Sequence, residues 1–216
     1  YEVINQANLV LDNSSKIDDA TERATVEGEA LFLRAMTYFD MVRFYGGVPL
    51  RTAGVTNYGA DLDIERASAD AIYAQVASDL NDAYIKLPAS NGEFADKYAA
   101  KALLARVHLQ LGNYAEALTA ANDVLANSGH SLASSFAGAF NNDSDSSEDI
   151  FAFQVTSQDG SNALITHYAD MAFGGRGGDI VVDTYRSLFD STLDVRRGFF
   201  YLSRDTGAIC TLKYTN

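Results

Sequence analysis

The chain has 216 residues, of which 47% are hydrophobic and 21% charged, a composition typical of a folded globular protein with one substantial core. Its 29 acidic side chains outnumber 16 basic ones, and the net charge of −13 argues against a nucleic-acid partner, whose phosphates require a basic surface. The single cysteine, Cys210, excludes an internal disulfide, and no apolar run is long enough to span a membrane.

Five segments of the first half carry apolar residues at helical spacing, so we expect helices over residues 1–12, 25–45, 68–87, 94–111 and 114–126. The polar residues 13–23 predict a linker. The second helix ends at Gly46 and Gly47, because glycine frees the backbone and the following Pro49 cannot continue a helix. Residues 46–67 are rich in Gly, Asn and Asp and predict a long loop, which ends where Ser68 caps the third helix.

The last two of these helices are joined by Leu-Gly-Asn-Tyr around Gly112, which indicates a degenerate tetratricopeptide (TPR) repeat of two antiparallel helices. The helices over 25–45 and 68–87 predict a second such pair, with residues 46–67 as an inserted loop. Two pairs are fewer than a self-standing solenoid needs, so the rest of the protein is expected to cover their exposed faces.

The helical period fades after Ser128. We expect a short buried strand over residues 150–155, a glycine-rich turn over 174–179, a short helix over 182–189 and an irregular tail. The predicted fold class is therefore all-α, with TPR-like antiparallel helix pairs and little strand. The predicted organisation is a helical part, residues 1–129, and a loop-rich part, residues 130–216, that packs on it as one incomplete domain.

No catalytic or metal-binding constellation is predicted. His108, His130 and His167 share no ligand spacing, and His108 is expected to be a hydrogen-bonded structural histidine. Asp205-Thr206-Gly207 spells an aspartic-protease triplet, but that chemistry needs two carboxylates and no second triplet follows, so we expect a turn.

Two groups of charged residues are interpreted without catalysis. The acidic loop with Asp143, Asp145 and Glu148 lacks the glycine and spacing of a calcium loop, so no metal is predicted, although the sequence leaves calcium binding open. Arg34, Asp40 and Arg43 lie on or beside one helix face, and we expect them to form a buried ion-pair network with a structural role.

Residues 27–50, EGEALFLRAMTYFDMVRFYGGVPL, carry a specific resemblance. The Gly-Glu-Ala-x-Phe-Leu-Arg-Ala and Tyr-Gly-Gly-Val-Pro-Leu wording closely resembles the hallmark helix of the SusD/RagB family, which are nutrient-binding outer-membrane lipoproteins. Further segments follow the family in order, among them residues 100–109, 112–117, 148–151 and 194–197. The likeness covers most of residues 1–200.

The resemblance implies a helical protein with four TPR-like helix pairs that covers a TonB-dependent (SusC-like) outer-membrane transporter and hands it oligosaccharides. It implies a binding protein, not an enzyme, with no cofactor. Members are anchored at the cell surface through a lipidated N-terminal cysteine, which this sequence lacks along with the first helix, so we expect it to be a piece of a longer protein. The alternative is a TPR-type scaffold, or a branch of the family, that binds peptides.

The candidate ligand residues lie in two loops, because rigid helices commonly present variable loops for binding. The loop after Pro49 contributes Asn57, Tyr58 and Asp61, with Asp63 nearby. A later loop contributes Tyr168, Phe173 and Arg176. Aromatic rings can stack on the C–H faces of a sugar, while Asn, Asp and Arg hydrogen-bond its hydroxyls. The alternative for each of these residues is ordinary loop packing.

Overall fold

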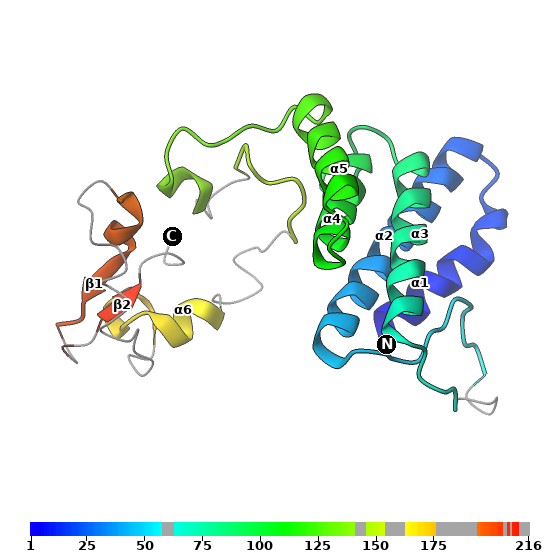
Figure 1. The fold of residues 1–216 in the computed structure, drawn as a ribbon, viewed down its shortest axis with the longest axis horizontal. Helices are drawn as coiled ribbons and strands as arrows, with labels where there is room; N and C mark the ends of the chain where they lie inside the picture. The colour runs from blue at the N-terminus through cyan, green and yellow to red at the C-terminus, as the bar shows by residue number, and fades with distance from the viewer. Residues whose placement is uncertain are drawn as a thin grey trace. The chain divides into compact units, whose positions relative to one another are not determined.

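The computed structural model describes residues 1–57, 63–140, 146–153, 163–175, 194–204, 207 and 209–211. The chain divides into two compact units, Tyr1–Gly129 and His130–Asn216. The fold is all-α with TPR-like helix pairs, as the sequence predicts, and its described strands are limited to one short hairpin (Figure 1).

The first unit is a row of five helices in which each packs on the next (Figure 1). They are listed here in chain order: α1 (Glu2–Asn13), α2 (Ala20–Tyr45), α3 (Ala69–Lys86), α4 (Lys97–Gln110) and α5 (Tyr114–Asn127), with a 3-10 turn at Ser14–Lys16. The core lies between the helices, where Tyr38, Ile72, Val76, Leu80 and Val107 are fully buried and Phe39 is nearly so.

The helix ends follow from capping chemistry. Ser68 accepts a hydrogen bond from the Ala71 N–H and caps the start of α3, as expected. Asp96 caps α4 by accepting from the N–H groups of Tyr98 and Ala99. The predicted linker over 13–23 is too long, because α2 already begins at Ala20. Asp19 accepts hydrogen bonds from the N–H groups of Thr21 and Glu22, so this cap extends the helix five residues beyond the predicted start.

The second unit holds short elements. These are a 3-10 turn (Ala137–Phe140), α6 (Ala163–Tyr168), a 3-10 turn (Met171–Phe173), a 3-10 helix (Val195–Phe199), and the strands β1 (Phe200–Leu202) and β2 (Ile209–Thr211). The strands pair antiparallel, with Tyr201 opposite Cys210. The Tyr201 hydroxyl accepts from the Asp170 N–H, and burial raises the pKa of this phenol to about 12.

Two predictions for this unit need correction. The described part of the predicted strand, residues 150–153, is not a strand; Phe151 and Phe153 instead pack edge to face with ring centroids 5.3 Å apart. The tail is not wholly irregular, because it contains the β1–β2 hairpin. The predicted helix over 182–189 and the acidic loop residues Asp143 and Asp145 lie outside the described residues.

Candidate functional site

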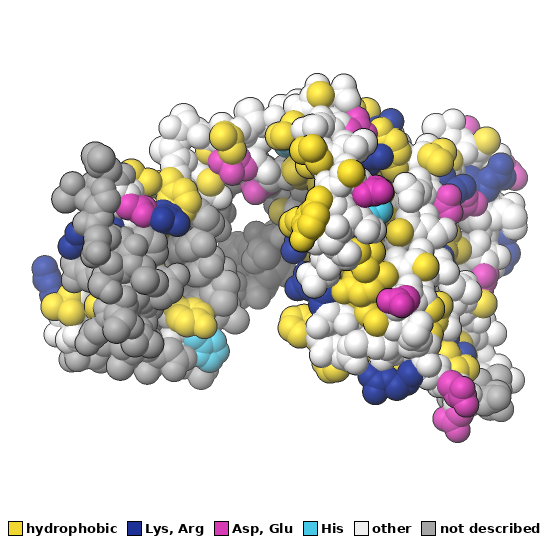
Figure 2. All heavy atoms as spheres, in the orientation of Figure 1, with side chains coloured by type: hydrophobic (Ala, Val, Ile, Leu, Met, Phe, Trp, Pro, Cys, Tyr) yellow, Lys and Arg dark blue, Asp and Glu magenta, His cyan; other side chains and the backbone are white. Residues whose placement is uncertain are grey.

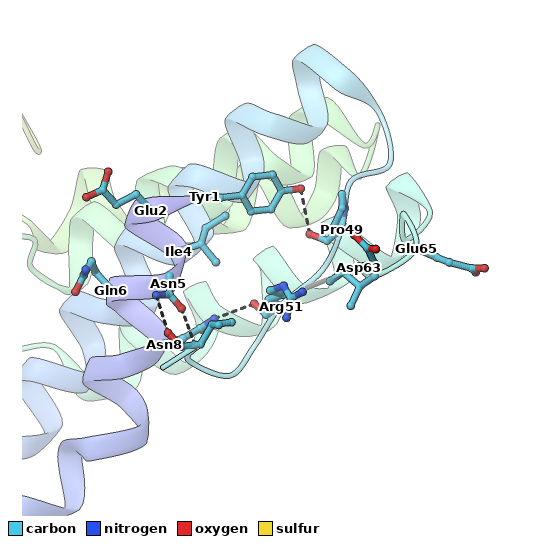
Figure 3. Close-up of a pocket in the computed structure, with 12 residues that line it drawn as sticks. Tyr1, Glu2, Ile4, Asn5, Gln6, Asn8, Pro49, Arg51, Asp63 and Glu65 are labelled. Atoms are coloured by element: carbon cyan, nitrogen blue, oxygen red, sulfur yellow. Dashed lines mark hydrogen bonds between the residues drawn. The ribbon is translucent and has the colours of Figure 1, made fainter. Parts of the chain in front are cut away.

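A pocket of about 760 Å³ lies between α1 and the loop that follows α2 (Figure 3). This volume is in the range of small-ligand sites. Both described parts of the loop line the pocket, with Val55 in residues 46–57 and Asp63 in residues 63–67. The lining residues are Tyr1, Glu2, Ile4, Asn5, Gln6, Asn8, Pro49, Arg51, Val55, Asp63, Ile64 and Glu65.

Helix α1 hydrogen-bonds residues 51–55 of this loop through three polar side chains. We call these side chains, Asn5, Asn8 and Asp12, the ladder. Asn5 makes two bonds to Val55, accepting from its N–H at 2.7 Å and donating to its carbonyl at 3.3 Å. Asp12 accepts from the Gly54 N–H at 2.7 Å. The three residues recur at i, i+3 and i+7, so they share one face of the helix.

Asn8 sits in the middle of the ladder and is fully buried. Its Nδ2 donates to the carbonyl oxygens of Arg51 and Ala53 at 3.2 and 3.1 Å, as Figure 3 shows for Arg51. Its Oδ1 accepts from Arg34 Nη1 at 2.7 Å. Every heavy atom of the amide that can hydrogen-bond therefore has a partner, which is what burial of a polar side chain requires.

The buried guanidinium of Arg34 ties this ladder to α3. Its Nε and Nη2 donate to the two carboxylate oxygens of Asp79 at 2.8 and 2.7 Å, a bidentate pair that is almost fully buried. The predicted network of Arg34, Asp40 and Arg43 is therefore wrong in its partners. Asp40 and Arg43 are exposed and 3.8 Å apart on the outer face of α2.

Tyr38 and Arg66 fix the two ends of the loop. The buried Tyr38 hydroxyl accepts from the Arg51 N–H at 2.7 Å and donates to the Arg51 carbonyl at 3.0 Å, and burial raises the pKa of this phenol. On the returning side, Arg66 donates to the carbonyls of Gly47 and Tyr45 at 2.7 and 2.8 Å. The two described sides of the loop, residues 46–57 and 63–67, are therefore both hydrogen-bonded, and we call them the loop stem.

The wall of the pocket mixes an aromatic ring, amides, carboxylates and a guanidinium. The Tyr1 hydroxyl donates to the Pro49 carbonyl at 3.4 Å, and burial raises the pKa of this phenol although Arg66 and Arg51 act to lower it. Arg51 and Asp63 come from the loop, and Glu65 points away from the pocket (Figure 3). Such a wall can offer hydrogen-bond donors and acceptors to a ligand rich in hydroxyl groups.

The residues predicted from sequence fall in both units. Asn57 is described and exposed, two residues beyond the pocket-lining Val55, while Tyr58 and Asp61 lie outside the described residues. In the second unit, Tyr168 is 43% exposed at the end of α6. Phe173 belongs to the following 3-10 turn, and its side chain and all of Arg176 are outside the described part. The ligand role of all six residues remains a prediction.

Most of the lining, including Asn5, Gln6 and Arg51, is not among the residues predicted from the sequence. One signal could have found part of it: Asn5, Asn8 and Asp12 place three hydrogen-bonding side chains on one helix face, next to a predicted long loop. No spacing rule could assign Arg51, because its position depends on the Tyr38 hydroxyl.

A smaller pocket of about 290 Å³ is lined by residues of α3, α4 and α5, among them Asn81, Lys101, His108 and Glu116. The expectation that His108 is a hydrogen-bonded structural histidine is wrong for its Nδ1, which is buried and has no hydrogen-bond partner among the described residues. Within the described ranges, no cluster of three or more His, Cys, Asp or Glu side chains could hold a metal ion. No helix in the same ranges has the length and apolar character needed to cross a membrane.

Comparison with known proteins places this helical scaffold in a family. A SusD-like family model, described as starch-binding and associating with the outer membrane, matches residues 1–109. The chain belongs to the SusD-like family. The SusD-like protein P25 of Formosa agariphila is 30% identical over 156 residues, which cover 69% of this chain and 29% of that protein.

Solved structures agree with this assignment of the SusD-like chain. A SusD-like protein from Bacteroides fragilis superposes with a TM-score of 0.68 at 28% identity, covering 81% of this chain and 37% of that one. A laminarin-binding SusD-like protein superposes with a TM-score of 0.60 at 26% identity, covering 63% and 32%. The chain thus spans less than two fifths of the length of each of these three relatives.

Proposed function

We propose that the SusD-like protein binds an oligosaccharide at the outer-membrane surface, with the pocket between α1 and the loop after α2 as part of its site. The observation that carries this proposal is the pocket itself, whose wall combines Tyr1, Asn5, Arg51 and Asp63. Membership of a family described as starch-binding and the likeness to a laminarin-binding protein support a sugar as the ligand.

The geometry suits capture without chemistry. An aromatic ring can stack on a sugar face, and amide, carboxylate and guanidinium groups can exchange hydrogen bonds with its hydroxyls. Because residues 51–55 are hydrogen-bonded to α1 and α2, and Arg66 to the Tyr45 carbonyl of α2, little conformational entropy of the stem is lost when a ligand binds. Binding is the whole proposed activity, and the protein is proposed not to be an enzyme.

We further propose that the bound oligosaccharide passes to a SusC-like TonB-dependent transporter and that a lipid anchor holds the full-length protein at the cell surface. The support is the family description, which associates such proteins with the outer membrane. Co-purification of the full-length protein with a TonB-dependent transporter from outer membranes tests this partner. Recovery from the periplasm without any transporter would contradict it.

Isothermal titration of the full-length protein with maltoheptaose and laminarihexaose tests the ligand class. We expect at least one of them to bind, and Arg51→Ala and Asp63→Ala to weaken that binding about tenfold each, which corresponds to about 1.4 kcal/mol. Tyr58→Ala tests the first predicted ligand loop in the same way, and Tyr168→Ala tests the second. Glu93→Ala, an exposed carboxylate away from the pocket lining, serves as the matched control.

The titration also separates this proposal from its alternative. Binding of peptides with no response to any oligosaccharide would favour the peptide-binding scaffold. An exposed apolar surface on α4 and α5 is the feature that supports that alternative, and it includes Leu109, Tyr114, Leu118 and Leu125 (Figure 2).

A further inference from the structure

We infer that Asp12, together with Asn5 and Asn8, acts as a positioning residue that sets the course of the ligand loop from a helix lying behind it. This inference rests on the proposed function of the pocket. Of the three, Asp12 is the informative case, because it contacts the loop but does not line the pocket. Its effect on a ligand would therefore act through the loop.

The ladder holds loop backbone rather than loop side chains. All of its bonds to residues 51–55 end on N–H or carbonyl groups, at Arg51, Ala53, Gly54 and Val55. Backbone groups that leave water need such partners, and in a sheet a neighbouring strand would supply them. Here the side chains of α1 supply these hydrogen-bond partners, so the loop backbone can hold a defined path that is not a β-strand.

Gly54 provides an independent sign that this path is specific. A Cβ atom at this position would lie 2.5 Å from Leu9 Cδ2 and 3.0 Å from Asp12 Oδ2. This close approach of the loop backbone to α1 leaves no room for a Cβ at position 54 unless the Leu9 side chain shifts. The short contact of 2.7 Å between the Gly54 N–H and the Asp12 carboxylate depends on that approach.

The ladder is itself held in orientation. Arg34 Nη1 donates to Asn8 Oδ1, which leaves the Asn8 Nδ2 to face the loop, and Arg34 is fixed in turn by both oxygens of Asp79. A buried chain of contacts thus runs from α3 through α2 and α1 to the backbone that borders the pocket. At the end of this chain, Asn5 and Asn8 hydrogen-bond the backbone of Val55 and Arg51 and so fix the positions of these two residues.

The test uses the full-length protein with the substitution Asp12→Ala, the conservative variant Asp12→Asn and the control Asn13→Ala. Asn13 lies next to Asp12 on α1, but its amide donates to the Leu9 carbonyl of its own helix. The readouts are amide hydrogen exchange at Gly54 and Val55, the melting temperature, and affinity for maltoheptaose and laminarihexaose.

We expect Asp12→Ala to speed exchange at Gly54 and Val55 and to weaken oligosaccharide affinity about fivefold to tenfold, with a melting temperature close to that of Asn13→Ala. Asp12→Asn keeps an acceptor oxygen and should restore most of the affinity. If Asp12 only stabilised the fold, Asp12→Ala would lower the melting temperature, and Asp12→Asn would not restore the oligosaccharide affinity. Unchanged exchange or unchanged affinity in Asp12→Ala overturns the inference alone, whereas no sugar binding by the unsubstituted protein overturns the proposed function and the inference with it.

Discussion

At the scale of single residues, stability and site geometry meet at the buried pair of Arg34 and Asp79. Removing one member of a buried ion pair leaves an unpaired charge and costs about 3–5 kcal/mol. We therefore expect Asp79→Ala to lower the free energy of unfolding by that amount in urea titrations. The control Asp40→Ala removes an exposed carboxylate that is 3.8 Å from Arg43, and it should change stability by less than about 0.5 kcal/mol. Equal effects of the two changes would refute the role of burial.

Glu27 predicts how stability responds to acid. Its carboxylate accepts hydrogen bonds from Lys86 Nζ and Ser14 Oγ, both at 2.6 Å, and these bonds hold the pKa of Glu27 below its usual value. Because the folded-state pKa is depressed, this contribution is complete above the unfolded pKa near 4.5 and is lost as pH falls through the folded value.

We expect Glu27→Gln to lower the urea midpoint at pH 7 and to flatten its decline between about pH 5 and pH 3. The control Glu93→Gln changes an exposed carboxylate on the loop before α4 and should leave the slope as it is in the unsubstituted protein. The measurement is a series of urea titrations across this pH range. Parallel curves for Glu27→Gln and the unsubstituted protein would show that the ion pair contributes nothing.

The sequence could predict features that involve neighbouring residues of one helix, but not contacts between residues far apart in the chain. Helical spacing predicted a helix over residues 1–12, and Ile4 and Asn8 are buried on the helix found there. It could not pair Arg34 with Asp79, since the two are 45 residues apart and periodicity only compares neighbours on one helix. The roles of Tyr58, Asp61 and Arg176 stay predictions.

At the scale of secondary-structure elements, the Gly-Gly-Val-Pro turn after α2 has a physical reason. Gly46 ends the helix with φ +68°, a value that glycine adopts without strain. A Cβ on Gly47 would lie 2.2 Å from the Ala67 carbonyl oxygen, where the two ends of the loop meet. The two glycines of the family-like Tyr-Gly-Gly-Val-Pro-Leu stretch are therefore needed where the two ends of the loop meet.

We expect Gly47→Ala to destabilise the protein by about 1–3 kcal/mol, as overpacking against fixed backbone does. The control Gly198→Ala adds a Cβ at a position with no heavy atom within 4 Å, so its effect should be small. Thermal unfolding of both variants gives the comparison. A Gly47→Ala protein as stable as the control would mean that the stem can open without cost.

Periodicity predicted every long helix of the first unit but not the short elements of the second. The strands β1 and β2 have three residues each, too few for an alternating pattern to emerge. The start of α2 was missed for a different reason: the cap Asp19 lies in a polar stretch whose composition resembles a linker.

At the scale of the whole molecule, the net charge of −13 bears on which glycans can bind. A surface with this charge repels polyanions at low ionic strength, and Glu2 and Asp63 add carboxylates to the pocket wall. We expect neutral oligosaccharides to bind more tightly than uronate or sulfated oligosaccharides of equal length in glycan-array measurements. Tighter binding of an anionic glycan at 20 mM salt, a concentration at which charge repulsion is only weakly screened, would contradict this expectation.

Hydrogen–deuterium exchange of the full-length protein, with and without saturating maltoheptaose or laminarihexaose, would show directly whether the pocket between α1 and the loop binds an oligosaccharide. We expect slower exchange in the pocket-lining parts of α1 and of residues 49–67, and no change on the exposed face of α5. Binding that leaves residues 49–67 unprotected, or no binding of either sugar, would contradict the claim that this pocket is an oligosaccharide site.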